Sequence, residues 1–125
     1  MKLILIFSHT LTEEQITDAK NSLDVDAFVY MPDNLVQLWA NVPTHKINMH
    51  QYLEPIQNFI FTQATKNDFV LIQGDFGATY NTVTFCKNNQ LKTIYSTTKR
   101  ISKEIYGNNG VEKISVFSHV LFREY

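Results

Sequence analysis

One segment constrains the fold of this chain more than any other. In Asp68–Tyr80 an uninterrupted apolar run meets two glycines just ahead of a helical pattern. A buried parallel strand typically reads as a continuous apolar run. Glycines at the carboxyl end of such a strand let the backbone approach a ligand beside the N-terminus of the next helix. The segment therefore predicts a strand-turn-helix junction at the ligand-binding edge of an α/β sheet.

Apolar runs and helical patterns alternate along the first hundred residues. Thr12 and Gln15 form a capping-box pattern that predicts a helix start, and a longer helical pattern begins near Asn48. Pro55 falls inside that pattern, so the helix either kinks there or starts late with Pro55 in its first turn. Strands are expected at Leu3–Phe7, Ala27–Met31, Phe69–Ile72 and Leu91–Tyr95.

Alternating strands and helices without two-residue hairpin turns imply right-handed βαβ crossovers. We therefore expect an α/β fold, a compact Rossmann-like domain with a mostly parallel sheet and helices on both faces. The length of 125 residues and the hydrophobic content of 44% suit one domain, 1–125, rather than two.

The C-terminal part changes character. Gly107–Gly110 supplies residues that tolerate positive φ, which predicts a tight antiparallel turn. We divide the domain accordingly into a βα core, 1–100, and a C-terminal β-hairpin, 101–125. Neither face of the second hairpin strand is purely polar, so we expect one side to pack on the body and the other to meet a partner subunit or a ligand.

Composition and charge exclude several classes of function. A formal charge of −1 argues against a binding face for long nucleic acid. The N-terminal apolar run is too short for a signal sequence or a membrane span, and the single Cys86 cannot form an internal disulfide. We expect a cytoplasmic protein without membrane contact. The scattered histidines, including His45 and His50, lack the spacing of a metal site, so we predict no metal and no cofactor.

The loops after the first, third and fourth strands should converge at the carboxyl edge of the sheet. They offer hydroxyls, an imidazole, an amide, backbone N–H groups and two cations, a set that suits a phosphodiester or nucleotide. The candidate residues are Ser8, His9 and Thr10 in the first loop, Gln73, Gly74, Asp75 and Phe76 in the second, and Ser96, Thr97, Thr98, Lys99 and Arg100 in the third.

Each of these candidates also has an ordinary interpretation. A Gly-Asp-Phe-Gly turn often binds nothing, and Asp75 fits a helix cap or a ribose-hydroxyl acceptor better than a phosphate contact. Lys99 and Arg100 can be a solvated loop pair. His9 can transfer a proton near neutral pH or simply be exposed.

Four segments carry a resemblance to a known family. They are Met1–Gln15, Leu71–Tyr80, Ser96–Arg100 and Ser115–Tyr125. Together they resemble a small CRISPR-associated accessory family of type III systems, which is similar to stand-alone Rossmann-like ring nucleases. The resemblance spans nearly the whole chain. It implies a homodimer that binds cyclic tetra-adenylate and cuts it to linear products without a metal.

The mechanism implied by the resemblance is attack of a ribose 2′-hydroxyl on the adjacent phosphorus, which leaves 2′,3′-cyclic phosphate ends. In that reaction His9 would carry a proton, and Lys99 or Arg100 would stabilise the phosphoryl charge. Ser8, Thr97 and Thr98 would orient phosphate or ribose. Two alternatives stay open: a non-catalytic sensor or sequestering protein for cyclic oligoadenylate, and a structural adaptor of a CRISPR complex.

Overall fold

The computed structural model describes all residues, 1–125, and contains one five-stranded sheet. The strand order is β2-β1-β3-β4-β5, with the first four strands parallel and β5 antiparallel to β4. This confirms the predicted α/β fold with a mostly parallel sheet. The strands are β1 (Lys2–Ile6), β2 (Ala27–Tyr30), β3 (Phe69–Ile72), β4 (Lys92–Gly107) and β5 (Gly110–Glu124).

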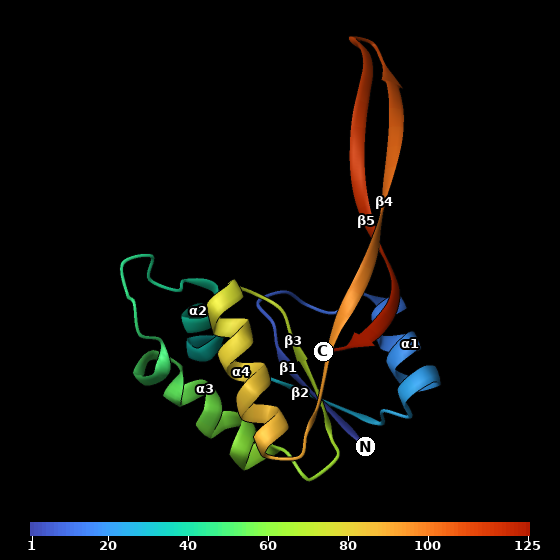
Figure 1. Ribbon diagram of the computed structural model, residues 1–125. Coiled ribbons are helices and arrows are strands. Elements are labelled where there is room, and N and C mark those ends of the chain that lie inside the picture. The colour runs from blue at the N-terminus through green and yellow to red at the C-terminus, as the bar shows by residue number, and fades with distance from the viewer.

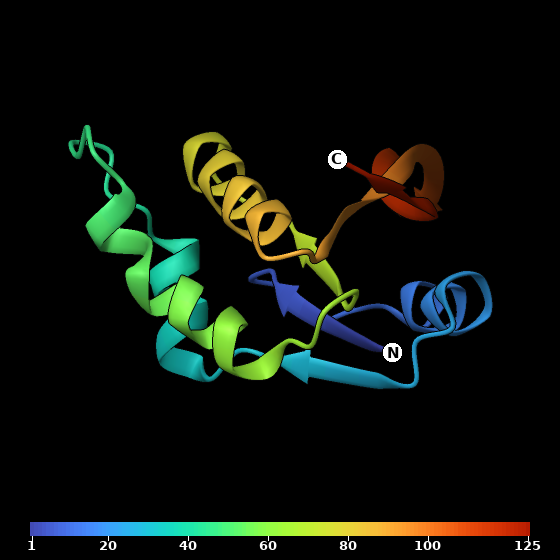
Figure 2. The same cartoon turned by 60° about the horizontal axis from the view of Figure 1, so that its bottom comes forward.

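Helices cover both faces of the sheet, as predicted. In Figures 1 and 2 the first helix lies on one side, beside the hairpin, and the other three lie together on the opposite side. Each face has its own hydrophobic cluster, and the apolar side chains of β1 and β3 alternate between the two clusters. The helices are α1 (Glu13–Leu23), α2 (Asp33–Ala40), α3 (His50–Gln63) and α4 (Phe76–Asn88).

Local signals account for where α1 begins. The Thr12 N–H donates to Gln15 Oε1 at 2.9 Å, and the Gln15 N–H donates to Thr12 Oγ1 at 3.2 Å. These reciprocal bonds are the predicted capping box, and they satisfy two backbone donors at the helix start.

The position of Pro55 rules out one of the two alternatives for the long helix. α3 starts at His50, so Pro55 lies inside the helix rather than in its first turn. The late-start interpretation is therefore wrong. Leu53, Ile56 and Ile60 are fully buried against the sheet, and this packing offsets the hydrogen bond that the proline cannot donate.

The C-terminal hairpin is longer than predicted, which is the main correction to the predicted fold. β4 runs without interruption from Lys92 to Gly107, so the hairpin begins well before Ile101 and the predicted loop Ser96–Arg100 is strand. β4 extends past the carboxyl edge of the sheet, and the hairpin rises from the body as a two-stranded ribbon (Figure 1). A register shift between Thr97 and Thr98 marks the point where it leaves the body.

None of the helices combines the length and the hydropathy needed to span a membrane.

Candidate ligand-binding site

The carboxyl ends of β1 and β3 lie side by side at one edge of the sheet. From there the chain continues from β1 to α1 on one face and from β3 to α4 on the other. Doubly wound sheets bind their ligands at such a switch point. The predicted residues of the first two loops, Ser8, His9, Thr10, Gln73, Gly74, Asp75 and Phe76, follow these two strands.

A cavity of about 380 Å³ lies at this edge, and we call it the edge cavity. Phe76, the first residue of α4, is 95% exposed, which is unusual for so large an apolar side chain. Three of the six lining residues are among the predicted site residues, whereas Thr79, Tyr95 and Tyr125 are not. The lining residues are Gln73, Gly74, Phe76, Thr79, Tyr95 and Tyr125.

The two tyrosines form one wall of the edge cavity. Their ring centroids are 4.8 Å apart and the planes are tilted by 46°. The Tyr125 hydroxyl donates to the carbonyl oxygen of Ile72 at 2.5 Å, and Arg123 Nη1 donates to the Tyr95 hydroxyl at 2.9 Å. Burial, and to a lesser extent the neighbouring Tyr95, raise the pKa of Tyr125, so its phenol stays neutral at physiological pH. The wall is therefore aromatic and held in place by hydrogen bonds.

Gly74 is explained by packing against the body. A Cβ built on this residue would lie 2.6 Å from Trp39 Nε1, closer than real side chains approach. The same indole N–H donates to the carbonyl oxygen of Gln73 at 2.8 Å. The β3–α4 turn thus rests on a buried tryptophan, and the glycine is needed there whether or not a ligand binds.

Asp75 caps α4. Its Oδ2 accepts a hydrogen bond from the backbone N–H of Ala78 at 3.0 Å. This contact is the helix cap that was predicted as one of two roles for Asp75. A carboxylate in this place competes with an anion for the amides at the helix start. The edge cavity therefore offers an aromatic surface and amide groups. The start of α4 beside it is already capped by Asp75.

The side chain of Gln73 joins the end of β3 to β4. Its Oε1 accepts the backbone N–H of Ser96 at 2.9 Å. Because Oε1 is held in this bond, the amide NH₂ group remains available as a donor at the cavity.

The third predicted loop does not exist as a loop. Thr97, Thr98, Lys99 and Arg100 lie in β4, paired with Leu121, His119, Ser118 and Phe117 of β5 respectively. Arg100 donates from Nε and Nη2 to Ser115 Oγ at 3.1 and 2.9 Å. The cations project from the hairpin, and neither lines the edge cavity. A polar strand was mistaken for a loop because its hydrogen-bond partners are distant in sequence.

The loop after β1 carries the remaining candidates. His9 is exposed, and its ring lies edge-on to Phe7 with the centroids 5.2 Å apart. Ser8 is half-buried and Thr10 is exposed. His9 thus makes an aromatic contact with Phe7, and neither of its ring nitrogens is hydrogen-bonded.

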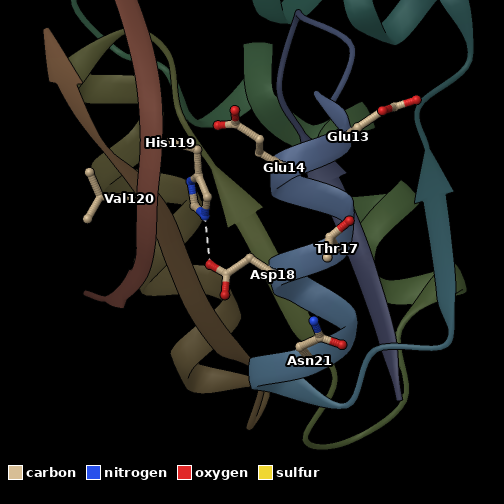
Figure 3. A pocket seen from close by; sticks show the side chains of 7 residues that line it. All are labelled: Glu13, Glu14, Thr17, Asp18, Asn21, His119 and Val120. Carbon is tan, nitrogen blue, oxygen red and sulfur yellow. Dashed lines mark hydrogen bonds and ion pairs between the residues drawn. The ribbon is translucent and has the colours of Figure 1, made fainter. Parts of the chain in front are cut away.

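A second, larger cavity of about 560 Å³ is lined by residues of α1 and β5 (Figure 3). His119 points from β5 toward Asp18 of α1, and its Nε2 lies 2.7 Å from Asp18 Oδ2. On the other side of the ring, Nδ1 lies 2.5 Å from Ser96 Oγ, and the same hydroxyl oxygen accepts a hydrogen bond from Gln15 Nε2 at 3.3 Å. The lining residues are Glu13, Glu14, Thr17, Asp18, Asn21, His119 and Val120.

The hydrogen-bonded series Ser96–His119–Asp18 contains the three groups of a hydrolytic triad. Its serine, however, is not accessible to a substrate. Ser96 is 7% exposed and lines neither cavity, so its hydroxyl cannot reach a substrate. The series instead connects β4, β5 and α1 at the root of the hairpin. Sequence reasoning missed it. The one available signal was an ionisable histidine inside the apolar run Val116–Phe122.

In the structure no group of three or more His, Cys, Asp and Glu side chains is placed to hold a metal ion.

The fold and the edge cavity define a small Rossmann-like α/β protein with a cavity lined partly by aromatic side chains and a projecting β-hairpin. The chain belongs to the family described as "Uncharacterized protein MJ1673 family", whose model matches residues 1–123. It is 49% identical over 124 residues to "Uncharacterized protein MJ1673" of Methanocaldococcus jannaschii, covering 99% of this chain and 96% of that protein. No solved structure matches the chain.

Proposed function

We propose that this protein is a ring nuclease of type III CRISPR antiviral signalling that acts in the cytoplasm. It would bind cyclic tetra-adenylate and cut it, without a metal or cofactor, to linear products with 2′,3′-cyclic phosphate ends. The proposal starts from the sequence resemblance, and the edge cavity supports it.

The observation that carries the proposal is the aromatic character of the edge cavity. Phe76, Tyr95 and Tyr125 surround a space of about 380 Å³ at the switch point of the sheet. Stacking of a base on an aromatic side chain is worth about 1–3 kcal/mol. The free amide donor of Gln73 can hydrogen-bond a base edge, so this cavity suits an adenine better than a phosphate.

Residues of the loop after β1 would carry out the reaction. The 2′-hydroxyl oxygen forms a bond to phosphorus while the bond from phosphorus to the 5′ oxygen breaks. His9 takes the proton from the 2′-hydroxyl, and the protonated His9 then gives it to the 5′ oxygen that leaves. Ser8 and Thr10 offer hydroxyl groups to the same phosphate. Because this route needs the attacking and leaving oxygens in line, much of the rate would come from positioning.

Lys99 would contact the ligand from the root of the hairpin rather than from a loop. It lies three residues beyond Ser96, or roughly 10 Å along the strand. A cyclic tetranucleotide lying on the edge and against the root can span that distance. A two-fold dimer would present the same residues to opposite sides of the symmetric ring, so each ring would be cut at two opposite phosphates.

The test is incubation of the protein with cyclic tetra-adenylate in EDTA, followed by separation of the products. We expect linear products with 2′,3′-cyclic phosphate ends. His9→Ala should slow single-turnover cleavage by about 10²-fold or more, whereas His45→Ala, another exposed histidine, should leave the rate unchanged. Intact nucleotide recovered from saturated wild-type protein would exclude the nuclease.

One observation favours a second candidate, a sensor that binds the cyclic nucleotide without cutting it. Lys99 and Arg100 lie on the hairpin, and Arg100 is engaged by Ser115, so no cation lines the edge cavity itself. A tight complex with uncut ligand in the same assay would identify the sensor.

A further inference from the structure

The outer part of the hairpin pairs with nothing but itself. We call residues 98–107 and 110–119 the arm, since their only ladder partners are one another. An isolated two-stranded ribbon is at best marginally stable in water. The arm therefore needs a covering surface that this chain does not supply.

The two faces of the arm differ in kind. Residues directly opposite each other in the ladder share a face. One face, which we call the aliphatic face, has β-branched side chains at its centre: Ile101 opposite Val116, and Ile114 and Ile105 further out. These four side chains are 39–48% exposed. Lys99, Lys103, Glu112 and Ser118 complete this face.

The opposite face is polar at its centre, where its side chains bond to one another. At its centre Ser102 lies opposite Ser115 and Glu104 opposite Lys113. The Tyr106 hydroxyl donates to Glu104 Oε2 at 3.0 Å, and Arg100 donates to Ser115. The exposed apolar side chains of this face, Phe117, Tyr106 and Val111, lie toward the two ends of the arm and are separated by that polar centre, so they form no continuous apolar strip.

We propose that the aliphatic face of the arm is a docking surface for the same face of a second copy of this chain. At the root of the arm, Ser118 donates to Glu14 of α1 at 3.2 Å, and beyond that contact the four aliphatic side chains remain exposed. Packing two such faces together covers eight β-branched side chains at once, as in a two-sheet sandwich.

Charge favours a second copy over other occupants. The aliphatic face carries both signs, with Lys99 and Lys103 on β4 and Glu112 on β5. A polyanion, an anionic membrane or an acidic protein would place negative charge against Glu112, and this repulsion disfavours each of them as the occupant. An identical face brings Glu112 of the partner subunit toward a lysine, and the net charge of −1 per chain gives little repulsion between copies.

The test is sedimentation velocity of the full chain over a wide concentration range, with no nucleotide present. It therefore does not depend on the proposed function and can fail separately from it. We expect a dimer, and Val116→Asp should weaken association by roughly a hundredfold or more. The matched control is Val111→Asp, because Val111 lies on the same strand, is similarly exposed and faces the other way. It should remain dimeric.

Charge variants test the contact between copies. Lys103→Glu and Glu112→Lys should each weaken self-association, and an equimolar mixture of the two should recover dimers, because each variant then meets the opposite charge. Near-ultraviolet circular dichroism and the body's unfolding temperature should match the wild type in all variants. A wild type that is monomeric throughout, or equal weakening by the two valine variants, would overturn the proposal.

Discussion

His119 Nε2 lies 2.7 Å from Asp18 Oδ2, although 101 residues separate them in the chain. The histidine reaches from β5 and the aspartate from α1. Because Nε2–H donates to the carboxylate, Nδ1 can accept the Ser96 hydroxyl. One imidazole thus ties the root of the hairpin to the body.

Replacing His119 tests how much this tie stabilises the fold. His119→Phe leaves the Ser96 hydroxyl without its acceptor and Asp18 without its donor, and it retains an aromatic ring. We expect a loss of about 1–3 kcal/mol in the free energy of unfolding, measured by urea denaturation. His45→Phe, at an exposed position, should change it little. Equal stabilities of the two variants would contradict the assignment.

Asp18 should make the stability depend on acid pH. Burial acts to raise the pKa of Asp18, but hydrogen bonds from Ser22 and His119 and the electrostatic attraction of His119 outweigh it and lower the pKa below its usual range. A lowered folded-state pKa means that the stabilisation is complete above the unfolded value of about 3.9 and is lost as pH falls through the folded pKa.

Ser22→Ala removes the hydrogen bond that Ser22 Oγ donates to Asp18 at 2.6 Å. The pKa of Asp18 should then rise toward its unfolded value, and the part of the stability that is lost in acid should become smaller. Carboxyl NMR shifts followed through a pH titration measure the first effect, and acid unfolding measures the second. Ser102→Ala, on the exposed arm, serves as the control. A titration of Asp18 that is identical in both variants would contradict the prediction.

Gly74 and Gly77 should respond in opposite ways to alanine. At residue 74 the added Cβ meets the Trp39 indole at 2.6 Å, and overpacking of this kind costs about 1–3 kcal/mol. At residue 77 the Cβ meets only Asp75 Oδ2 at 3.5 Å, and an alanine inside α4 should add up to about 1 kcal/mol. Thermal unfolding of the two variants gives the comparison, and a stabilising Gly74→Ala would show that the turn does not rest on Trp39.

Phe76 should matter for ligand binding and not for folding. The side chain is 95% exposed at the edge cavity, so Phe76→Ala removes a stacking surface and no core contact. We expect affinity for cyclic tetra-adenylate to fall by about 1–3 kcal/mol, measured by calorimetry at low temperature on the slow-cutting His9→Ala background. Phe61→Ala, also exposed and also on a helix, is the matched control. Equal affinities in the two variants would remove Phe76 from the site.

Features of the fold that depend on residues close in sequence were predicted correctly, whereas some features that depend on residues far apart in sequence were not. The capping box of Thr12 and Gln15 lies within one helical turn, and it was predicted correctly. The segment Ser96–Arg100 was predicted as a loop, because its polar residues show no alternation and the partners that make it a strand lie near the end of the chain.

The same distinction holds for the candidate site. The β3–α4 junction was predicted from its apolar run and glycines, and it does line the edge cavity. The reason for Gly74 was not predictable, since Trp39 reaches it only through the packing of α2 against the sheet. Tyr125 was missed for a similar reason, because its hydroxyl bonds to Ile72 through the pairing of β5 with β4.

Cys86 gives a last test, of the core on the α4 side of the sheet. The thiol is fully buried, and burial raises its pKa to about 12. At pH 8 only about one molecule in 10⁴ would carry the reactive thiolate. A thiol reagent such as Ellman's should therefore leave the native protein unmodified and react with one thiol per chain in urea. Because modification then requires opening of the core, its rate should rise in the less stable Gly74→Ala variant. Rapid stoichiometric labelling of the native wild type would show that α4 does not pack as described.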